Sequence, residues 1–332
     1  MLDSTEKSVG VGSGALLAGP TEERRGPSYG DRVWAGLMVA LGGSILVAAG
    51  LVLLMLYRLA RPLGAVVSPL AFLSGSDWDP MSNAFGALPF IYGTVVTSVL
   101  AMLVAVPASV GMAVFLVEMA PAWVRPVVSF LIETLAAIPS VVYGLWGLFV
   151  LVPWLRGSVE PFLGKAFGFL PLFQGPPIGL GYLAAGLVLA VMILPTIASV
   201  SIEVLKTVPV PLREGALGLG ATRWEAIRMT VLPYARNGIL GGSLLGLGRA
   251  LGETMAVTMV IGNSPSIRAS LFAPGYTLPA VIANEFAEAT GAVQIGALAG
   301  LGLVLFGLSV VLNAVARLLV QGVARGPKRR RA

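Results

Sequence analysis

The sequence predicts an all-α membrane protein with six transmembrane helices, and three observations lead to this prediction. Apolar residues make up 56% of the 332-residue chain and charged residues only 11%, whereas charged residues are about a quarter of an ordinary soluble domain. Six stretches are long and apolar enough for a spanning helix, which needs roughly 20 residues. The basic residues are concentrated between these stretches. A bilayer therefore supplies the apolar solvent that this composition requires.

The predicted spans follow one another along the chain at residues 33–57, 90–117, 127–152, 179–202, 238–262 and 292–316. The first has 25 consecutive uncharged positions, which is too long for a signal-peptide core, so we expect a retained membrane anchor. Residues 1–32 mix Gly, Ser, Pro and charges without periodicity, which predicts a disordered cytoplasmic leader. Residues 321–332 are expected to form a basic cytoplasmic tail.

The distribution of Lys and Arg predicts the orientation in the membrane. Six spans bring both termini to the same side, and 16 of the 22 basic residues lie on that side, against 5 on the other. The positive-inside rule makes the richer side cytoplasmic. The leader arginines also favour a weak attraction to anionic membrane lipid. Because the charges follow topology and form no basic face, no nucleic-acid partner is expected.

The residue types that are missing exclude most enzyme chemistry. The chain has no Cys and no His, so disulfides, thiolates, imidazole metal sites and the commonest general base are all absent. It also has no Gly-x4-Gly-Lys-Ser/Thr phosphate-binding loop. We therefore expect no catalytic residue, no metal and no cofactor, and any ATP hydrolysis must take place on another subunit.

The fifth predicted span carries two charges, Arg249 and Glu253. Each costs at least about 2.5 kcal/mol at the centre of a membrane helix, so such residues face protein or water. Their spacing of four residues places them on one helix face and predicts a mutual ion pair. Alternatively, Arg249 faces a water-filled path and offers its planar donors to an oxyanion, with Glu253 holding it in place. Glycines 238, 242 and 246, and again 248 and 252, predict two seams for close helix packing.

The longest predicted cytoplasmic loop, residues 203–237, has a helical pattern. Thr222 and Glu225 fit a capping box, which predicts a helix start at about Arg223. Gly220 suits the C-terminus of a preceding short helix. Trp224 falls at helical spacing with the apolar residues Ile227, Val231 and Leu232, and Pro233 would end or kink the helix. Taken alone, this pattern is also that of an amphipathic hairpin on the membrane surface.

This loop resembles the EAA loop of permease subunits in binding-protein-dependent ABC importers. The motif is a glutamate, two small residues, three further positions and a glycine, with an isoleucine-x-leucine-proline further on. In this sequence the matching positions are Glu214, Gly215, Ala216, Gly220, Thr230, Leu232 and Pro233. Gly215 and Thr230 depart from the usual alanine and isoleucine. The resemblance implies docking on a cytoplasmic ATPase through these residues, together with Arg213, Thr222, Arg223, Trp224 and Glu225.

The segment from residue 247 to 257, LGRALGETMAV, followed by Val260-Ile261-Gly262-Asn263, resembles the PstC-type permease family of phosphate ABC importers. Similar stretches at residues 138–147, 194–197 and 277–280 extend the likeness to residues 85–320. The resemblance implies a type I ABC importer permease (MetI-like) fold in a prokaryotic inner membrane. The candidate residues of the substrate path are Arg249, Glu253, Thr254 and Glu133. The implied partners are a PstA-type second permease, a PstB-type ATP-binding dimer and a PstS-type phosphate-binding protein.

Three other functions remain open at this stage. A permease of the same class could carry another oxyanion, such as molybdate or sulfate. A secondary transporter or channel could use Arg249 and Glu253 as an ion relay without any ATPase. A membrane-embedded enzyme is disfavoured because the chain lacks His, Cys and a clustered carboxylate pair.

Overall fold

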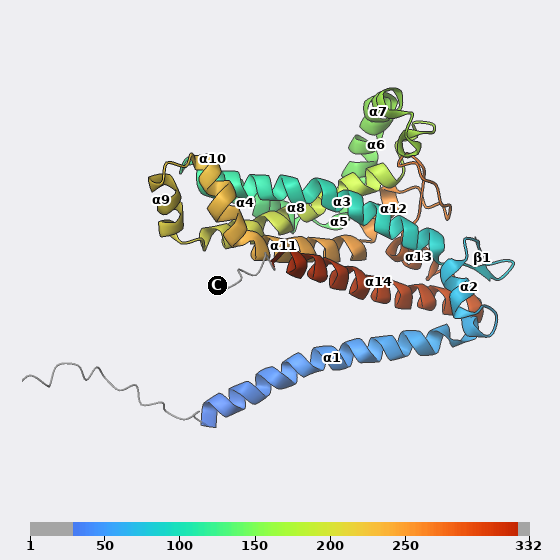
Figure 1. Ribbon diagram of the computed structural model, residues 1–332. Helices are drawn as coiled ribbons and strands as arrows, with labels where there is room; N and C mark the ends of the chain where they lie inside the picture. The colour runs from blue at the N-terminus through green and yellow to red at the C-terminus, as the bar shows by residue number, and fades with distance from the viewer. Residues whose placement is uncertain (1–28, 325–332) are drawn as a thin grey trace, which may run out of the picture. The chain divides into compact units, whose positions relative to one another are not determined.

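The computed structural model describes residues 29–324, which form helices and a single two-stranded ribbon (Figure 1). The chain divides after Leu53 into two units, and the packing reported below lies within the second. The α-helices are α1 (Tyr29–Gly64), α2 (Pro69–Ser74), α3 (Leu88–Val114), α4 (Val124–Ala137), α5 (Ser140–Trp146), α6 (Val152–Trp154), α7 (Glu160–Phe167), α8 (Tyr182–Lys206), α9 (Val210–Gly218), α10 (Arg223–Ala226), α11 (Leu232–Gly252), α12 (Met255–Val260), α13 (Leu278–Glu285) and α14 (Ala292–Ala324).

Several of these helices are joined through π-helical turns into longer rods. The π-helical segments are η1 (Phe115–Met119), η2 (Gly147–Leu151), η3 (Leu155–Val159) and η5 (Ile227–Val231), and η4 (Pro171–Phe173) is a 3-10 helix. The strands β1 (Trp78–Asp79) and β2 (Ala84–Phe85) pair antiparallel, with Trp78 opposite Phe85.

Five helices of the described residues are long and apolar enough to cross a membrane. They are Arg32–Gly64, Leu88–Met119, Ser140–Phe167, Tyr182–Lys206 and Ala292–Leu318. The first, second, fourth and sixth predicted spans are therefore confirmed as long apolar helices. The other long helix, α11, is not among the five, and it carries two basic residues, Arg236 and Arg249.

The third predicted span, residues 127–152, is wrong as a continuous helix. Proline disfavours helical backbone at the residue before it and lacks an amide donor. Accordingly, α4 ends at Ala137, Ile138 is extended with ψ 129°, and α5 begins after Pro139. The apolar rod then runs on from Ser140 to Phe167. The helix break thus moves this membrane segment toward the C-terminus.

The fifth predicted span, residues 238–262, is also interrupted. Helix α11 ends at Gly252, Glu253 adopts an extended conformation (φ −72°, ψ 128°), and α12 starts at Met255. The short helix α12 is in turn followed by Gly262, which has a positive φ of 90°. This segment is consequently a helix, a break and a second short helix.

The core of the second unit is built around α8, which packs on α3 and on α11. Gly186 of α8 allows this approach, because a Cβ there would lie 2.5 Å from Leu100 Cδ2 of α3. The hydroxyls of Thr94, Thr97 and Thr134 donate to backbone carbonyls one turn earlier. These three hydroxyls are thereby satisfied by the backbone of their own helices.

The two ends of the α3–α8 pair carry different structures (Figure 1). Helices α9 and α10 lie at one end, and α7, the β1–β2 ribbon and α13 lie toward the other. Residues 29–32 of the predicted leader belong to α1, and residues 321–324 of the predicted tail belong to α14. The remaining parts of both segments, residues 1–28 and 325–332, lie outside the described residues.

Candidate functional site

Arg249 lies in the last turn of α11 with an exposed side chain. Its Nη1 donates to Oγ1 of Thr196 on α8 over 3.4 Å. A Cβ at Gly248 or Gly252, on either side of it, would have no neighbour within 4 Å. The described residues therefore leave this face of α11 open around a single guanidinium.

The predicted ion pair between Arg249 and Glu253 is wrong. A pair four residues apart meets only if both residues are helical, and Glu253 has already left the helix. Its Oε1 instead accepts the backbone N–H of Ala256 over 3.1 Å, at the start of α12. Among the described residues the ion pairs are Lys206–Glu203 and Arg213–Glu118. The charge of Arg249 is thus not neutralised by a carboxylate of the described chain.

The two helix breaks lie against each other, because α5 packs on α12. A Cβ at Gly144 of α5 would lie 2.6 Å from Met259 Sδ and 3.0 Å from Ala256 Cα. On the other side, Tyr143 Oη donates to the carbonyl of Leu135 over 2.7 Å and so bridges the break between α4 and α5. These contacts hold both breaks in place next to Arg249.

Two further candidates have different surroundings. Thr254 is partly buried at the start of α12, and its carbonyl accepts the hydroxyl of Thr258 over 2.8 Å. Glu133 is exposed on α4. The structure brings Arg249, Glu253 and Thr254 into one short segment, and no hydrogen bond of the described residues joins Glu133 to them.

Of the two predicted glycine seams, the first is a packing seam. Cβ atoms at Gly238 and Gly246 would lie 2.4 Å from Val204 Cγ2 and 2.7 Å from Ile197 Cδ1, both on α8, and Gly242 also faces α8. The second seam, at Gly248 and Gly252, contacts nothing among the described residues within 4 Å.

The predicted capping box of the loop at residues 203–237 is confirmed. Thr222 Oγ1 accepts the N–H of Glu225 over 3.3 Å, and Glu225 Oε2 accepts the N–H of Thr222 over 2.8 Å. The backbone N–H and the hydroxyl of Thr222 lower the pKa of the Glu225 carboxyl, because both stabilise its charged form. Helix α10 begins at Arg223, as predicted.

Gly220 ends the preceding helix through a Schellman motif. Its φ is 91°, a conformation that costs glycine little. Its N–H donates to the carbonyl of Leu217 over 3.0 Å, and the N–H of Ala221 donates to that of Ala216 over 3.1 Å. These two hydrogen bonds are those of the motif, so α9 and α10 are joined by a defined turn.

Arg213 has a role that the sequence prediction missed. Its Nη2 binds Glu118 Oε1 over 2.8 Å and the carbonyl of Leu205 over 3.0 Å, and its Nη1 binds the carbonyl of Val208 over 2.8 Å. The expected role of Arg213 in orienting a partner is therefore unsupported, because the guanidinium faces its own chain. Nothing in the sequence pattern singles out Glu118, which lies 95 residues away.

The outer face of the loop is apolar and exposed. Leu219 is 92% exposed, Met229 70% and Trp224 60%, and Glu214 and Arg223 are exposed beside them. Trp224 was predicted to share a face with Ile227 and Val231, which are buried. That prediction is wrong, since Trp224 is exposed while Ile227 and Val231 are buried.

Pro233 does not end the helix, since α11 continues through it from Leu232. The proline stands directly after η5, in the first turn of α11, where a missing amide donor is tolerated. In residues 29–324, no group of three or more His, Cys, Asp or Glu side chains is arranged to hold a metal ion.

Comparison with known proteins identifies the family. The family described as binding-protein-dependent transport system inner membrane component matches residues 105–325. The phosphate transport system permease protein PstC of Xylella fastidiosa (strain 9a5c) is 51% identical over 260 residues, which cover 77% of this chain and 80% of the relative. PstC 2 of Mycobacterium tuberculosis (strain ATCC 25618 / H37Rv) is 38% identical over 306 residues, 90% of this chain and 94% of the relative.

Solved structures support the same fold at low sequence identity. A bacterial ABC transporter involved in the import of alginate superposes with a TM-score of 0.56 at 16% identity, covering 89% of this chain and all of that chain. The MetNI methionine ABC transporter superposes with a TM-score of 0.52 at 18% identity, covering 75% of this chain and all of that chain. The predicted type I importer permease fold is confirmed.

Members of this family are multi-pass components of the inner membrane. They are not the catalytic subunits, and they work with an ATPase and a binding protein. The matches cover most of this chain and most of each relative. The chain therefore belongs to the inner-membrane components of binding-protein-dependent transport systems and, among them, to the PstC group of phosphate transport system permeases.

Proposed function

We propose that this chain forms, together with a second permease of the PstA type, the membrane path for inorganic phosphate, and that Arg249 binds the anion during passage. The observation that carries the proposal is an exposed guanidinium without a carboxylate partner in the described chain, placed at a helix break among open glycines. The names of the relatives supply the substrate.

The chemistry of the segment suits transient binding. A guanidinium presents a planar fork of donors that matches the oxygens of phosphate. Glu253 follows within the same break, and its negative charge opposes tight retention of an anion. Glu253 is partly occupied by the N–H of Ala256, which keeps the carboxylate from closing onto Arg249. We include Thr254 as a hydroxyl donor in the path and Glu133 as a second charge at its edge.

In this proposal, ATP hydrolysis on partner subunits opens and closes the membrane path, and the cytoplasmic loop transmits the movement. We infer that an ATP-binding dimer of the PstB type receives the exposed apolar side chains of Leu219 and Trp224, with Glu214 and Arg223 fixing orientation. Arg213 ties α9 to the ends of η1 and α8. A push on α9 is therefore passed on to two long membrane helices, which is the coupling that an importer needs.

We further propose that both termini are cytoplasmic and that the chain crosses the membrane six times, with the broken α11–α12 segment as the fifth crossing. The 16 basic residues on the side of the termini, against 5 on the other, support this orientation. A phosphate-binding protein of the PstS type then delivers the anion at the opposite face.

Replacement of Arg249 tests the proposal directly. In vesicles that contain the complete transporter with ATP inside, Arg249→Gln is expected to lower phosphate uptake by at least tenfold while the complex still assembles. Arg268→Gln, which removes an exposed arginine outside the path, is the matched control. Uptake of molybdate or sulfate in preference to phosphate would reassign the substrate, and wild-type uptake by Arg249→Gln would refute the role of the arginine. Uptake without ATP would favour a secondary transporter.

A further inference from the structure

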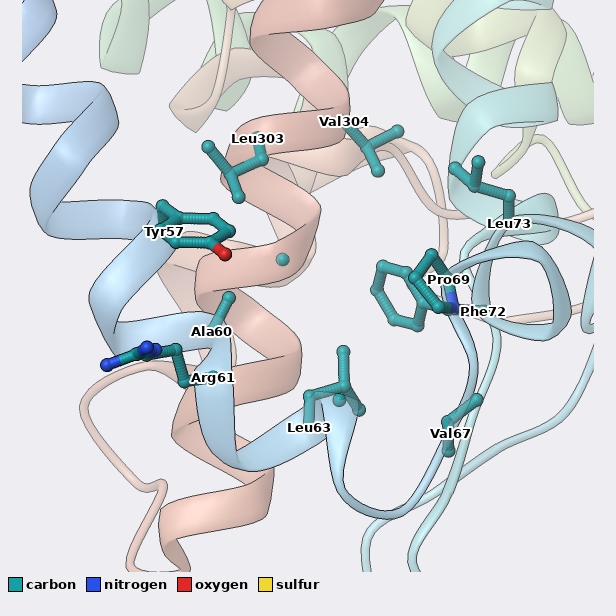
Figure 2. A pocket seen from close by; sticks show the side chains of 12 residues that line it. Tyr57, Ala60, Arg61, Leu63, Val67, Pro69, Phe72, Leu73, Leu303 and Val304 are labelled. Atoms are coloured by element: carbon teal, nitrogen blue, oxygen red, sulfur yellow. The ribbon is translucent and has the colours of Figure 1, made fainter.

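A cavity of about 540 Å³ lies between the C-terminal turns of α1, the short helix α2 and α14 (Figure 2). Its lining residues all belong to the unit that begins at Leu54. Helices α1 and α14 are both long and apolar enough to cross a membrane. Two walls of this cavity are therefore formed by helices that have the length and composition of membrane spans.

Close packing at one end gives the cavity a defined shape. A Cβ at Gly296 of α14 would lie 3.2 Å from the backbone nitrogen of Leu63 and 3.3 Å from the carbonyl oxygen of Leu59. One turn further along α14, a Cβ at Gly300 would lie 3.3 Å from the ring of Phe72 on α2. Leu63 and Phe72 are both buried. A Cβ at Gly302 would also lie 3.4 Å from Leu56 Cδ1 of α1. Helices α1 and α14 thus stay in contact along this stretch, and the cavity opens beside that contact, toward α2.

The lining is apolar except at its edge. It consists of Tyr57, Ala60, Arg61, Leu63, Gly64, Val67, Pro69, Phe72, Leu73, Gly300, Leu303 and Val304. Arg61 is the one charged residue of this set, and its guanidinium points away from the apolar side chains (Figure 2). The structure shows no hydrogen bond or ion pair from Arg61 to another described side chain. Tyrosine and arginine at the end of a spanning helix are typical of the membrane interface.

We propose that this cavity holds an acyl chain of a membrane phospholipid whose phosphate binds Arg61. The volume falls within the range of about 300–1,000 Å³ that small-molecule sites occupy. Apart from Arg61 and the hydroxyl of Tyr57, the lining side chains are apolar, so buried water would find few hydrogen-bond partners there. The apolar interior and the cationic edge match the two ends of a phospholipid, and the guanidinium has the charge and geometry for its phosphate. This site is separate from the path around Arg249 and does not depend on the transported substrate.

Filling the cavity tests the acyl-chain half of the proposal. The complete transporter is purified in mild detergent, and native mass spectrometry counts the bound phospholipids. Ala60→Phe places a ring in the cavity and is expected to remove one retained phospholipid. Met55→Phe adds the same ring on an exposed position of α1 that does not line the cavity, and is expected to retain it. Leu303→Trp fills the cavity from α14 and gives the same loss if Ala60→Phe fails to assemble.

The headgroup half is tested by charge removal. In nanodiscs of phosphatidylcholine and phosphatidylglycerol, Arg61→Gln is expected to lower retention of phosphatidylglycerol several-fold. Arg58→Gln, one turn earlier and outside the cavity lining, is expected to leave it unchanged. A photoreactive residue at Leu303 is expected to capture lipid. Unchanged phospholipid counts in both filling variants, equal effects of the two arginine changes, or capture of the second permease at Leu303 would each overturn the proposal.

Discussion

Arg213 is the side chain whose position most changes the interpretation of the loop at residues 203–237. It binds Glu118 and two backbone carbonyls and is only about one fifth exposed. The Arg213–Glu118 ion pair can be compared with the Lys206–Glu203 ion pair of the same chain, whose side chains are largely exposed. Exposed pairs contribute little because water screens them, whereas a half-buried guanidinium with three acceptors holds two segments together.

Removal of the guanidinium is expected to destabilise the loop. Arg213→Gln should lower the free energy of unfolding by about 2 kcal/mol, the scale of hydrogen bonds to charged groups. Arg213→Lys should rescue only part of this, because an ammonium cannot reach the three acceptors as a planar fork does. Thermal unfolding of the purified complex measures the effect. Glu203→Gln is the control, with an expected cost below about 0.5 kcal/mol, and equal losses in both variants would contradict the argument.

At the scale of elements, the N-terminal capping box stabilises the first turn of the continuous rod formed by α10, η5 and α11. Thr222→Ala is expected to cost about 1 kcal/mol, and Thr222→Ser should retain most of the stability because it keeps the acceptor. Hydrogen exchange at the amide of Glu225, which donates to Thr222, reports the change. Equal protection in the Ala and Ser variants would show that the cap does not hold the helix.

Because the pKa of the Glu225 carboxyl is lowered, the stability of α10 depends on pH. A carboxyl whose folded pKa lies below its unfolded value stabilises the fold above about pH 4.3, the unfolded value for Glu. This contribution decreases as the pH falls below that value and is lost when the pH passes the folded pKa. Exchange protection of the loop should therefore decline on acidification, and Glu225→Gln should remove this dependence. An unchanged acid profile in Glu225→Gln would contradict the assignment.

The glycine seam of α11 is the other feature that belongs to the scale of elements. Gly238→Ala places a Cβ 2.4 Å from Val204 Cγ2 and is expected to cost about 1–3 kcal/mol through overpacking. Gly241→Ala, in the same helix with nothing within 4 Å, should be neutral or stabilising by up to about 1 kcal/mol. Thermal unfolding of the two variants measures the difference, and the prediction fails if Gly241→Ala is the more harmful change.

At the scale of the whole molecule, the arrangement in the membrane can be tested because the chain has no Cys. Met81, in the β1–β2 turn, and Leu219, in the loop at residues 203–237, are 94% and 92% exposed. Met81→Cys should react with an impermeant thiol reagent added outside intact cells. Leu219→Cys should react only after the membrane is opened. Labelling of Leu219→Cys from outside would reverse the proposed topology.

Much of this fold could be predicted from local patterns. Spans 33–57 and 292–316, the capping box at Thr222 and the turn at Gly220 are all confirmed, because each depends on residues close together in the chain. The predictions that failed, the continuous spans 127–152 and 238–262 and the ion pair of Arg249 with Glu253, depended on whether the helix is interrupted there. Pro139 is visible in the sequence, yet kinking and ending a helix have the same local signal. No proline lies next to Glu253, so the sequence has no proline signal for the end of the helix at this position.

The sequence by itself determined that the chain is a membrane protein, where four of its long apolar helices lie, and where the loop helix begins, because apolar length and capping act over a few residues. Only the tertiary structure decided that Arg249 lies beside Thr196 and not beside Glu253, and that Arg213 binds Glu118. These contacts join residues 53 and 95 positions apart. Side-chain pairing over such distances depends on how whole helices pack, and no local periodicity encodes it.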